Sequence, residues 1–90
     1  MELLTVKDKK VIVTGGASGI GAEICKSFLV HESRVAVIDI GISSKIKEEY
    51  IESSSEESVL FFCGDVTDEQ FIKAAIKQTV DIWGTADILI

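Results

Sequence analysis

Short apolar runs alternate with amphipathic stretches along this sequence. The runs at Val11–Val13, Arg34–Asp39 and Ser58–Cys63 are rich in β-branched and aromatic residues, and their centres show no polar alternation. Such runs are typical of strands that are buried on both faces of a parallel sheet. A fourth run of this kind occupies Asp87–Ile90. The pattern therefore predicts four strands.

Three stretches between these runs predict helices. The first begins near Gly19 and fades near His31, the second extends from Ser43 to about Ser53, and the third extends from Thr67 to Trp83. Their apolar residues recur at the spacing of one helical face. We expect the short connection between the second helix and the third strand to be the most mobile loop, because its centre consists of serine and glutamate.

The ends of the third helix carry local signals. Thr67 and Gln70 match the two outer positions of a capping box, which predicts a helix start at Thr67. Gly84 is expected to stop the same helix. Trp83 and the apolar residues of this helix are interpreted as a face buried against the sheet.

The order βαβαβαβ, without proline and without internal repeats, predicts an α/β fold with a doubly wound parallel sheet. With strand order 3-2-1-4, right-handed crossovers place the first two helices on one face and the third on the other. One helix would then cover four strands. We expect apolar side chains to be partly open to water in Val11–Val13, Val35–Ile38, Val59–Phe62 and Ile88–Ile90. The chain is therefore expected to self-associate or form a homo-oligomer, to unfold in part, or to depend on a partner that supplies the missing half.

A glycine-rich loop, Thr14–Gly21 with the sequence TGGASGIG, connects the first strand to the first helix. Its glycines at Gly15, Gly19 and Gly21 predict a sharp turn and a helix N-terminus that is left open. Free N–H groups and the helix dipole favour an anion there, and the missing side chains allow a pyrophosphate close to the backbone. No Gly-Lys-Ser/Thr sequence follows, which argues against a nucleoside triphosphatase loop.

Asp39 ends the second strand, 18 residues after Gly21. At this distance a carboxylate can accept hydrogen bonds from the ribose hydroxyls of a dinucleotide, and its charge would repel the 2′-phosphate of NADP. The glycine loop holds no basic residue, and Ile40 and Gly41 follow the aspartate. The sequence therefore favours NAD over NADP. An aspartate that merely ends a strand is the plainer alternative.

Composition limits the class of protein. The chain has 90 residues, of which 47% are hydrophobic and 27% charged, so it is long enough for one small domain. Its formal net charge of −6 argues against nucleic acid or an anionic membrane as a partner. No signal peptide or membrane span is recognised, and we expect a cytoplasmic protein. Cys25 and Cys63 are interpreted as reduced structural thiols and His31 as a surface or capping residue.

The loop Thr14–Gly21 resembles the T-G-x-x-x-G-I-G signature of the classical short-chain dehydrogenase/reductases, a Rossmann-fold family that uses NAD or NADP. The similarity extends over nearly the whole chain, because Asp39, Gly64–Val66 and Asp87–Ile90 follow in the family's order. Within the family, the sequence most resembles the hydroxyprostaglandin-dehydrogenase-like branch. The resemblance implies an oxidoreductase that interconverts a secondary alcohol and a ketone by hydride transfer.

The resemblance also implies which residues bind the cofactor. It places Asp65 and Val66 against the adenine ring, where the carboxylate would accept a hydrogen bond from the exocyclic amine. Asp65 could equally belong to the loop and help to cap the third helix. The residues expected to bind the cofactor are Gly15, Gly16, Ala17, Ser18, Gly19, Ile20, Gly21, Asp39, Ile40, Asp65 and Val66.

The catalytic residues of the family cannot be assigned. Its reaction uses a tyrosine with a lowered pKa, a lysine four residues later and a serine that orients the carbonyl. Tyr50 is the only tyrosine, and Ser54 stands four residues after it. Residues 1–90 therefore resemble the N-terminal dinucleotide-binding part of a single Rossmann-fold domain, truncated after the fourth strand and inactive alone. The alternatives are a non-catalytic nucleotide-binding or dimerisation module and a flavodoxin-like domain, which Asp39 disfavours.

Overall fold

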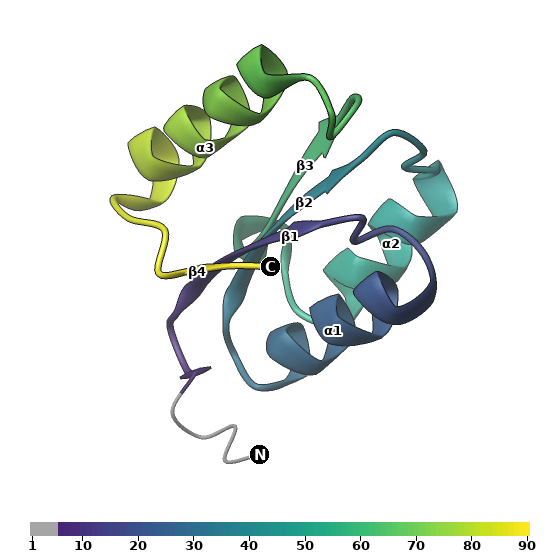
Figure 1. Cartoon of the computed structure of the whole chain (residues 1–90). Coiled ribbons are helices and arrows are strands. Elements are labelled where there is room, and N and C mark those ends of the chain that lie inside the picture. The colour runs from purple at the N-terminus through teal and green to yellow at the C-terminus, as the bar shows by residue number, and fades with distance from the viewer. Residues whose placement is uncertain (1–5) are drawn as a thin grey trace.

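Four strands, three α-helices and a short 3₁₀ helix follow one another along residues 6–90, the part of the chain that this computed structural model describes (Figure 1). Each predicted strand and helix is present, with ends that differ from the prediction by a residue or two. The elements are β1 (Lys10–Thr14), α1 (Gly19–Val30), β2 (Arg34–Asp39), α2 (Ser44–Glu52), η2 (Glu56–Ser58), β3 (Val59–Cys63), α3 (Glu69–Trp83) and β4 (Ile88–Leu89).

The strands form one parallel sheet in the order β3-β2-β1-β4, which confirms the predicted topology. Val11 in β1 pairs with Val35 in β2 on one side and with Ile88 in β4 on the other. α1 and α2 lie on one side of the sheet and α3 on the other (Figure 1). The carboxyl ends of β1, β2 and β3 therefore meet at one edge, where the chain turns into α1, α2 and α3.

Two hydrophobic clusters fill the space between the layers. Successive side chains of a strand point to opposite faces, so β1 and β2 contribute to both clusters. The cluster beneath α1 and α2 consists of Val11, Val13, Cys25, Phe28, Leu29, Val35, Val37, Tyr50 and Val59. The cluster beneath α3 consists of Ile12, Ala36, Ile38 and Ala75, with Leu60, Phe62, Phe71, Ile72, Ile76, Trp83 and Ala86 packed against it. The expected buried face of the third helix is thus confirmed.

The expectation that the central strands are partly open to water is wrong. The apolar side chains of Val11–Val13 and Val35–Ile38 are at most 1% exposed. One helix is enough there because α3 packs in one cluster with side chains of β1, β2 and β3, and the small side chains of Ala36 and Ala75 lie in this cluster. Exposure is confined to the flanks, where Leu60–Phe62 in β3 are half-buried.

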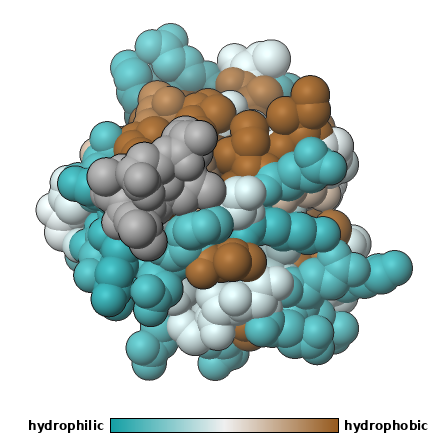
Figure 2. Space-filling view, turned by 90° about the horizontal axis from the view of Figure 1, so that it is seen from below, coloured by the Kyte–Doolittle hydropathy of each residue, from teal (hydrophilic) through white to brown (hydrophobic). Residues whose placement is uncertain are grey.

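Apolar side chains are exposed at the other flank of the sheet and on α3. Leu89 in β4 is 62% exposed and Ile82 in α3 is 59% exposed. On the face seen from below, hydrophobic side chains gather along one side (Figure 2). Exposed apolar side chains on an edge strand favour contact with other chains.

We therefore predict that the 90-residue chain self-associates. Size-exclusion chromatography with light scattering at micromolar concentration, together with a dye for exposed apolar surface, measures this directly. Leu89→Lys should weaken the association, because a charge on the edge strand opposes pairing. A compact monomer that binds no dye would contradict the prediction.

The start of α3 differs from the predicted capping box. The N-cap is Asp68, whose Oδ1 accepts hydrogen bonds from the backbone N–H groups of Gln70 and Phe71 at 3.0 and 3.2 Å. The Thr67 hydroxyl instead donates to Asp65 Oδ1 at 2.7 Å, so it is not available to cap the helix. As predicted, α3 ends at Gly84, whose N–H donates to the carbonyl oxygen of Val80.

The segment predicted as a mobile loop contains the 3₁₀ turn η2. The Ser55 and Ser58 hydroxyl oxygens lie 2.9 Å apart across it and share a hydrogen bond. His31 is the C-cap residue of α1, with its Nδ1 2.7 Å from the carbonyl oxygen of Ser27, as expected for a capping residue. None of the helices within residues 6–90 combines the length and the hydropathy that a membrane span requires.

Candidate functional site

The glycine loop leaves β1 through a turn that requires glycine. Gly15 has φ +67°, in the left-handed region, and its N–H donates to the carbonyl oxygen of Ile38 in β2 at 2.7 Å. The first turn of α1 then packs directly on this backbone. A Cβ at Gly21 would lie 2.0 Å from the Gly15 carbonyl oxygen, so any side chain at Gly21 would push the helix off the turn.

The N-terminus of α1 is open. Its N-cap, Ser18, makes no side-chain hydrogen bond to the helix, and the first turn contains no acidic residue. Within residues 6–90 the backbone N–H groups of Gly19, Ile20 and Gly21 have no hydrogen-bond partner. By contrast, α2 and α3 are capped by the side chains of Ser43 and Asp68. Among these three helices, α1 alone lacks a side-chain cap, and its first three N–H groups and the positive end of its dipole are available to an anion.

Asp39 reaches the glycine loop from the end of β2. Its Oδ2 accepts a hydrogen bond from the backbone N–H of Ala17 at 3.0 Å, and its Oδ1 accepts from Gly41 at 3.3 Å. The carboxylate is therefore held in place beside the loop rather than left free at a strand end. Ile40, next in the chain, is exposed. The structure thus brings together the glycine loop and the carboxylate that the sequence singled out.

Asp65 lies in the turn between β3 and α3. Its Oδ1 accepts hydrogen bonds from the Thr67 hydroxyl and from the Thr67 backbone N–H at 2.7 and 2.8 Å, and these bonds lower the pKa of the carboxyl group. Asp65 therefore has the loop role that the sequence left open, but it does not cap α3, whose N-cap is Asp68. Asp39 pairs with Cys63 in the sheet, so Asp65 and the exposed Val66 follow at the same sheet edge as Asp39.

Two buried groups support the glycine loop from below, and sequence reasoning did not find them. The Tyr50 hydroxyl of α2 donates to the carbonyl oxygen of Gly16 at 2.5 Å. The Cys25 thiol of α1 packs against Gly16, where a Cβ would lie 2.9 Å from its sulfur. Tyr50 occupied an apolar position of a predicted helix, and a buried tyrosine needs a partner for its hydroxyl. The sequence could therefore have indicated that the Tyr50 hydroxyl needs a buried hydrogen-bond acceptor, but not that this acceptor is Gly16.

Burial changes the ionisation of both groups. Desolvation raises the pKa of the Cys25 thiol from 9.0 to about 12. Desolvation, followed by the nearby charges of Cys25, Glu49 and Asp39, raises the pKa of Tyr50 from 10.0 to about 12. Both groups are therefore neutral in the folded protein at physiological pH.

These pKa values predict loss of stability at alkaline pH. In the unfolded chain the two groups release their protons near their ordinary pKa values, whereas in the folded chain they keep them up to about pH 12. The free energy of unfolding should therefore fall as pH rises from about 9 to 12, by at most about 1.4 kcal/mol per pH unit and group. Urea titrations at several pH values measure this slope. Cys25→Ala should reduce it, and an equal slope in that variant would contradict the assignment.

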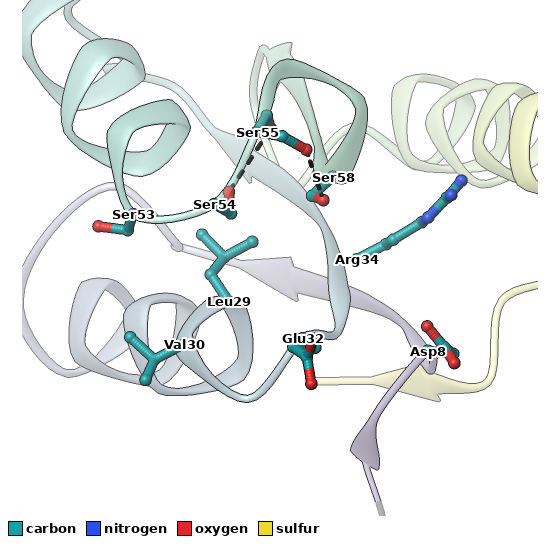
Figure 3. Close-up of a pocket in the computed structure, with 9 residues that line it drawn as sticks. All are labelled: Asp8, Leu29, Val30, Glu32, Arg34, Ser53, Ser54, Ser55 and Ser58. Atoms are coloured by element: carbon teal, nitrogen blue, oxygen red, sulfur yellow. Dashed lines mark hydrogen bonds between the residues drawn. The ribbon is translucent and has the colours of Figure 1, made fainter.

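A pocket of about 360 Å³ lies at the opposite end of the sheet, away from the glycine loop (Figure 3). It is formed between the C-terminal ends of α1 and α2 and the start of β2, and its lining includes Glu32, Arg34 and Ser58. Ligands of open α/β sheets bind at the carboxyl ends of the strands. This pocket is at the amino end of β2 and is not the candidate site.

The chain matches a known protein family over most of its length. Residues 9–90 match the model of the family described as short chain dehydrogenase. The chain belongs to this family. Members of this family of oxidoreductases use NAD or NADP as cofactor.

Individual short-chain dehydrogenases show the extent of the similarity. The chain is 38% identical over 81 residues to short-chain dehydrogenase reductase 3b of Arabidopsis thaliana, an alignment that covers 90% of this chain and 31% of that protein. It is 34% identical over 84 residues to xanthoxin dehydrogenase of the same plant, covering 91% of this chain and 30% of that protein. The chain thus spans about a third of the length of these relatives.

A solved short-chain dehydrogenase has the same fold. The crystal structure of a short chain dehydrogenase from Bacillus anthracis superposes with a TM-score of 0.78 at 29% identity, covering 93% of this chain and 35% of that one. The parallel sheet with helices on both faces is therefore the Rossmann-type arrangement that the sequence predicted.

Proposed function

We propose that the chain forms the NAD(H)-binding part of a short-chain oxidoreductase that interconverts a secondary alcohol and a ketone. The observation that supports this is the open N-terminus of α1 beside the Asp39 carboxylate at the carboxyl edge of the sheet. When bound, the nicotinamide cofactor supplies the hydride chemistry. Membership of the short chain dehydrogenase family supports the same reaction class.

The residues present fit a dinucleotide. The free N–H groups of Gly19–Gly21 would hold the pyrophosphate, since they are donors without acceptors and the first turn of α1 contains no acidic side chain. A Cβ built at Gly15 or Gly19 meets no atom within 4 Å, so the outer side of the loop is open to a ligand. In this proposal Asp39 accepts from the adenosine ribose, and Asp65 and Val66 lie against the adenine.

We expect NAD to bind more tightly than NADP, by about tenfold or more, because the Asp39 carboxylate repels a 2′-phosphate. Asp39→Ala should narrow this ratio, since it removes both the hydrogen bonds to the ribose and the repulsion. Titration calorimetry with each nucleotide measures the ratio. Asp65→Ala is the matched control, because the adenine is common to both cofactors and the ratio should stay constant. Equal affinities in the unmutated protein would refute the preference.

A non-catalytic nucleotide-binding or dimerisation module is the second candidate. It is favoured by the position of Tyr50, which is buried beneath the glycine loop and is not placed to exchange a proton with a substrate. In the first candidate, the catalytic serine, tyrosine and lysine are supplied by residues outside this chain, and residues 1–90 are the N-terminal part of one Rossmann-fold domain. The hydroxyprostaglandin-dehydrogenase-like branch and the cytoplasmic location stay predictions.

A further inference from the structure

A single peptide unit of the glycine loop is held at both of its polar atoms. The carbonyl oxygen of Gly16 accepts a hydrogen bond from the Tyr50 hydroxyl at 2.5 Å. The N–H of the same peptide unit belongs to Ala17 and donates to Asp39 Oδ2 at 3.0 Å. Both partners come from the β2–α2 segment, 34 and 22 positions away from the residues they bind.

We propose that Tyr50 is a positioning residue for the dinucleotide, which acts by fixing the orientation of the Gly16–Ala17 peptide together with Asp39. This inference rests on the proposed function, because it assigns to Tyr50 a role in the same cofactor site. It differs from a proton-transfer role, since the Tyr50 side chain is fully buried and its hydroxyl is already bonded to the loop.

The Gly16–Ala17 peptide is thus held by two hydrogen bonds, one to Tyr50 and one to Asp39, and we call this pair the clamp. The clamp matters because a glycine-rich backbone can rotate easily. Gly15 and Gly16 have no side chains to restrict their dihedral angles, so the peptide that follows them could adopt several orientations. The free N–H groups of Gly19–Gly21 begin two residues after Ala17. Holding the Gly16–Ala17 peptide in the free protein means that this part of the loop does not have to be ordered when the nucleotide binds, and this preorganisation raises affinity.

In this proposal Asp39 both accepts the hydrogen bond from Ala17 and binds the ribose. A carboxylate offers about four acceptor positions, and the N–H groups of Ala17 and Gly41 occupy one on each oxygen. Positions on both oxygens remain for ribose hydroxyls. The N–H of Ala17 in the glycine loop therefore orients Asp39, the residue proposed to bind the ribose. Tyr50 in turn holds the carbonyl end of the same Gly16–Ala17 peptide.

The test compares Tyr50→Phe with the unmutated protein. The variant removes one oxygen atom and keeps the buried ring. We expect the affinity for NAD, measured by titration calorimetry, to fall by about three- to tenfold. Without nucleotide, hydrogen exchange at the Ala17 amide should become faster by a similar factor, because the peptide is then held at one end only.

Thr79→Val is the matched control. The Thr79 hydroxyl is also fully buried and donates to a backbone carbonyl, that of Ala75 at 2.8 Å, but it lies in α3 on the other face of the sheet. This variant should lower thermal stability comparably while NAD affinity and exchange at Ala17 stay unchanged. Equal changes in NAD affinity for the two variants would show a general loss of stability and overturn the inference.

A double-mutant cycle with Asp39→Asn completes the test. Because Tyr50 and Asp39 act on one peptide unit, the double variant should lose less NAD affinity than the product of the two single losses. Independent, multiplicative losses would overturn the clamp. If Tyr50→Phe bound NAD as tightly as the unmutated protein, the inference alone would fail. If the unmutated protein bound no NAD, the proposed function would fail with it.

Discussion

Replacing Gly21 by alanine is expected to reduce NAD affinity by about a hundredfold or more. The added Cβ would lie 2.0 Å from the Gly15 carbonyl oxygen and 2.8 Å from the Gly15 carbonyl carbon, both of them backbone atoms. A backbone contact this short cannot be relieved by rotating a side chain, so the start of α1 or the turn must move. Misplacing groups by about 1 Å can lower an enzyme's rate by about a hundredfold, and we expect a loss of the same order in NAD affinity. Titration calorimetry with NAD measures the loss.

Gly41→Ala is the control for this substitution. A Cβ at Gly41 meets no atom within 4 Å, and its backbone N–H stays available to Asp39. The control should therefore retain NAD affinity within about twofold, since surface substitutions away from packed groups have small effects. If Gly21→Ala bound NAD as well as Gly41→Ala, the close approach between α1 and the Gly15 turn would have no functional importance.

The second prediction is that the 90-residue chain by itself shows no dehydrogenase turnover. Tyr50 cannot serve as the proton-transfer group, because it is buried, donates to Gly16 and has a pKa raised to about 12. Four residues after Tyr50 stands Ser54 rather than a lysine, and its hydroxyl donates to the carbonyl oxygen of Tyr50 at 2.9 Å. Loss of general acid–base catalysis and of substrate orientation lowers rates by about 10⁴-fold or more.

The assay follows NADH production from secondary alcohols, with a full-length short-chain dehydrogenase as reference. NAD binding is measured on the same sample, so that missing chemistry is separated from a missing cofactor. NAD binding without turnover is the expected result. Turnover within about tenfold of the reference would show that a catalytic group of this chain has been overlooked.

The order of the elements, and the position of the glycine loop between β1 and α1, follow from local sequence patterns. Apolar β-branched runs such as Val11–Val13 are local patterns, and a strand buried on both faces cannot be built from alternating polar residues. The spacing of Gly15, Gly19 and Gly21 likewise describes a local turn into a helix. The βαβ order and the right-handed crossover rule were then sufficient for the strand order β3-β2-β1-β4.

Local sequence motifs predicted helix caps less well where several neighbouring side chains could make the same hydrogen bond. Thr67 matched a capping box, yet Asp68 caps α3 because the Thr67 hydroxyl bonds to Asp65. The burial of β1 and β2 was also misjudged. The number of helices on each face follows from the sequence, but the strands that α3 covers depend on how the helix packs.

The support of the glycine loop depends on contacts between elements that local sequence patterns do not specify. The hydrogen bond from Tyr50 to Gly16 joins residues 34 positions apart, and that from Ala17 to Asp39 joins residues 22 positions apart. Periodicity assigns a side chain to a face of its own element, whereas a contact between elements depends on how α2 crosses the sheet and how deeply it packs. This packing brings the hydroxyl of Tyr50, which occupies an apolar position of α2, within hydrogen-bond distance of Gly16 in the glycine loop.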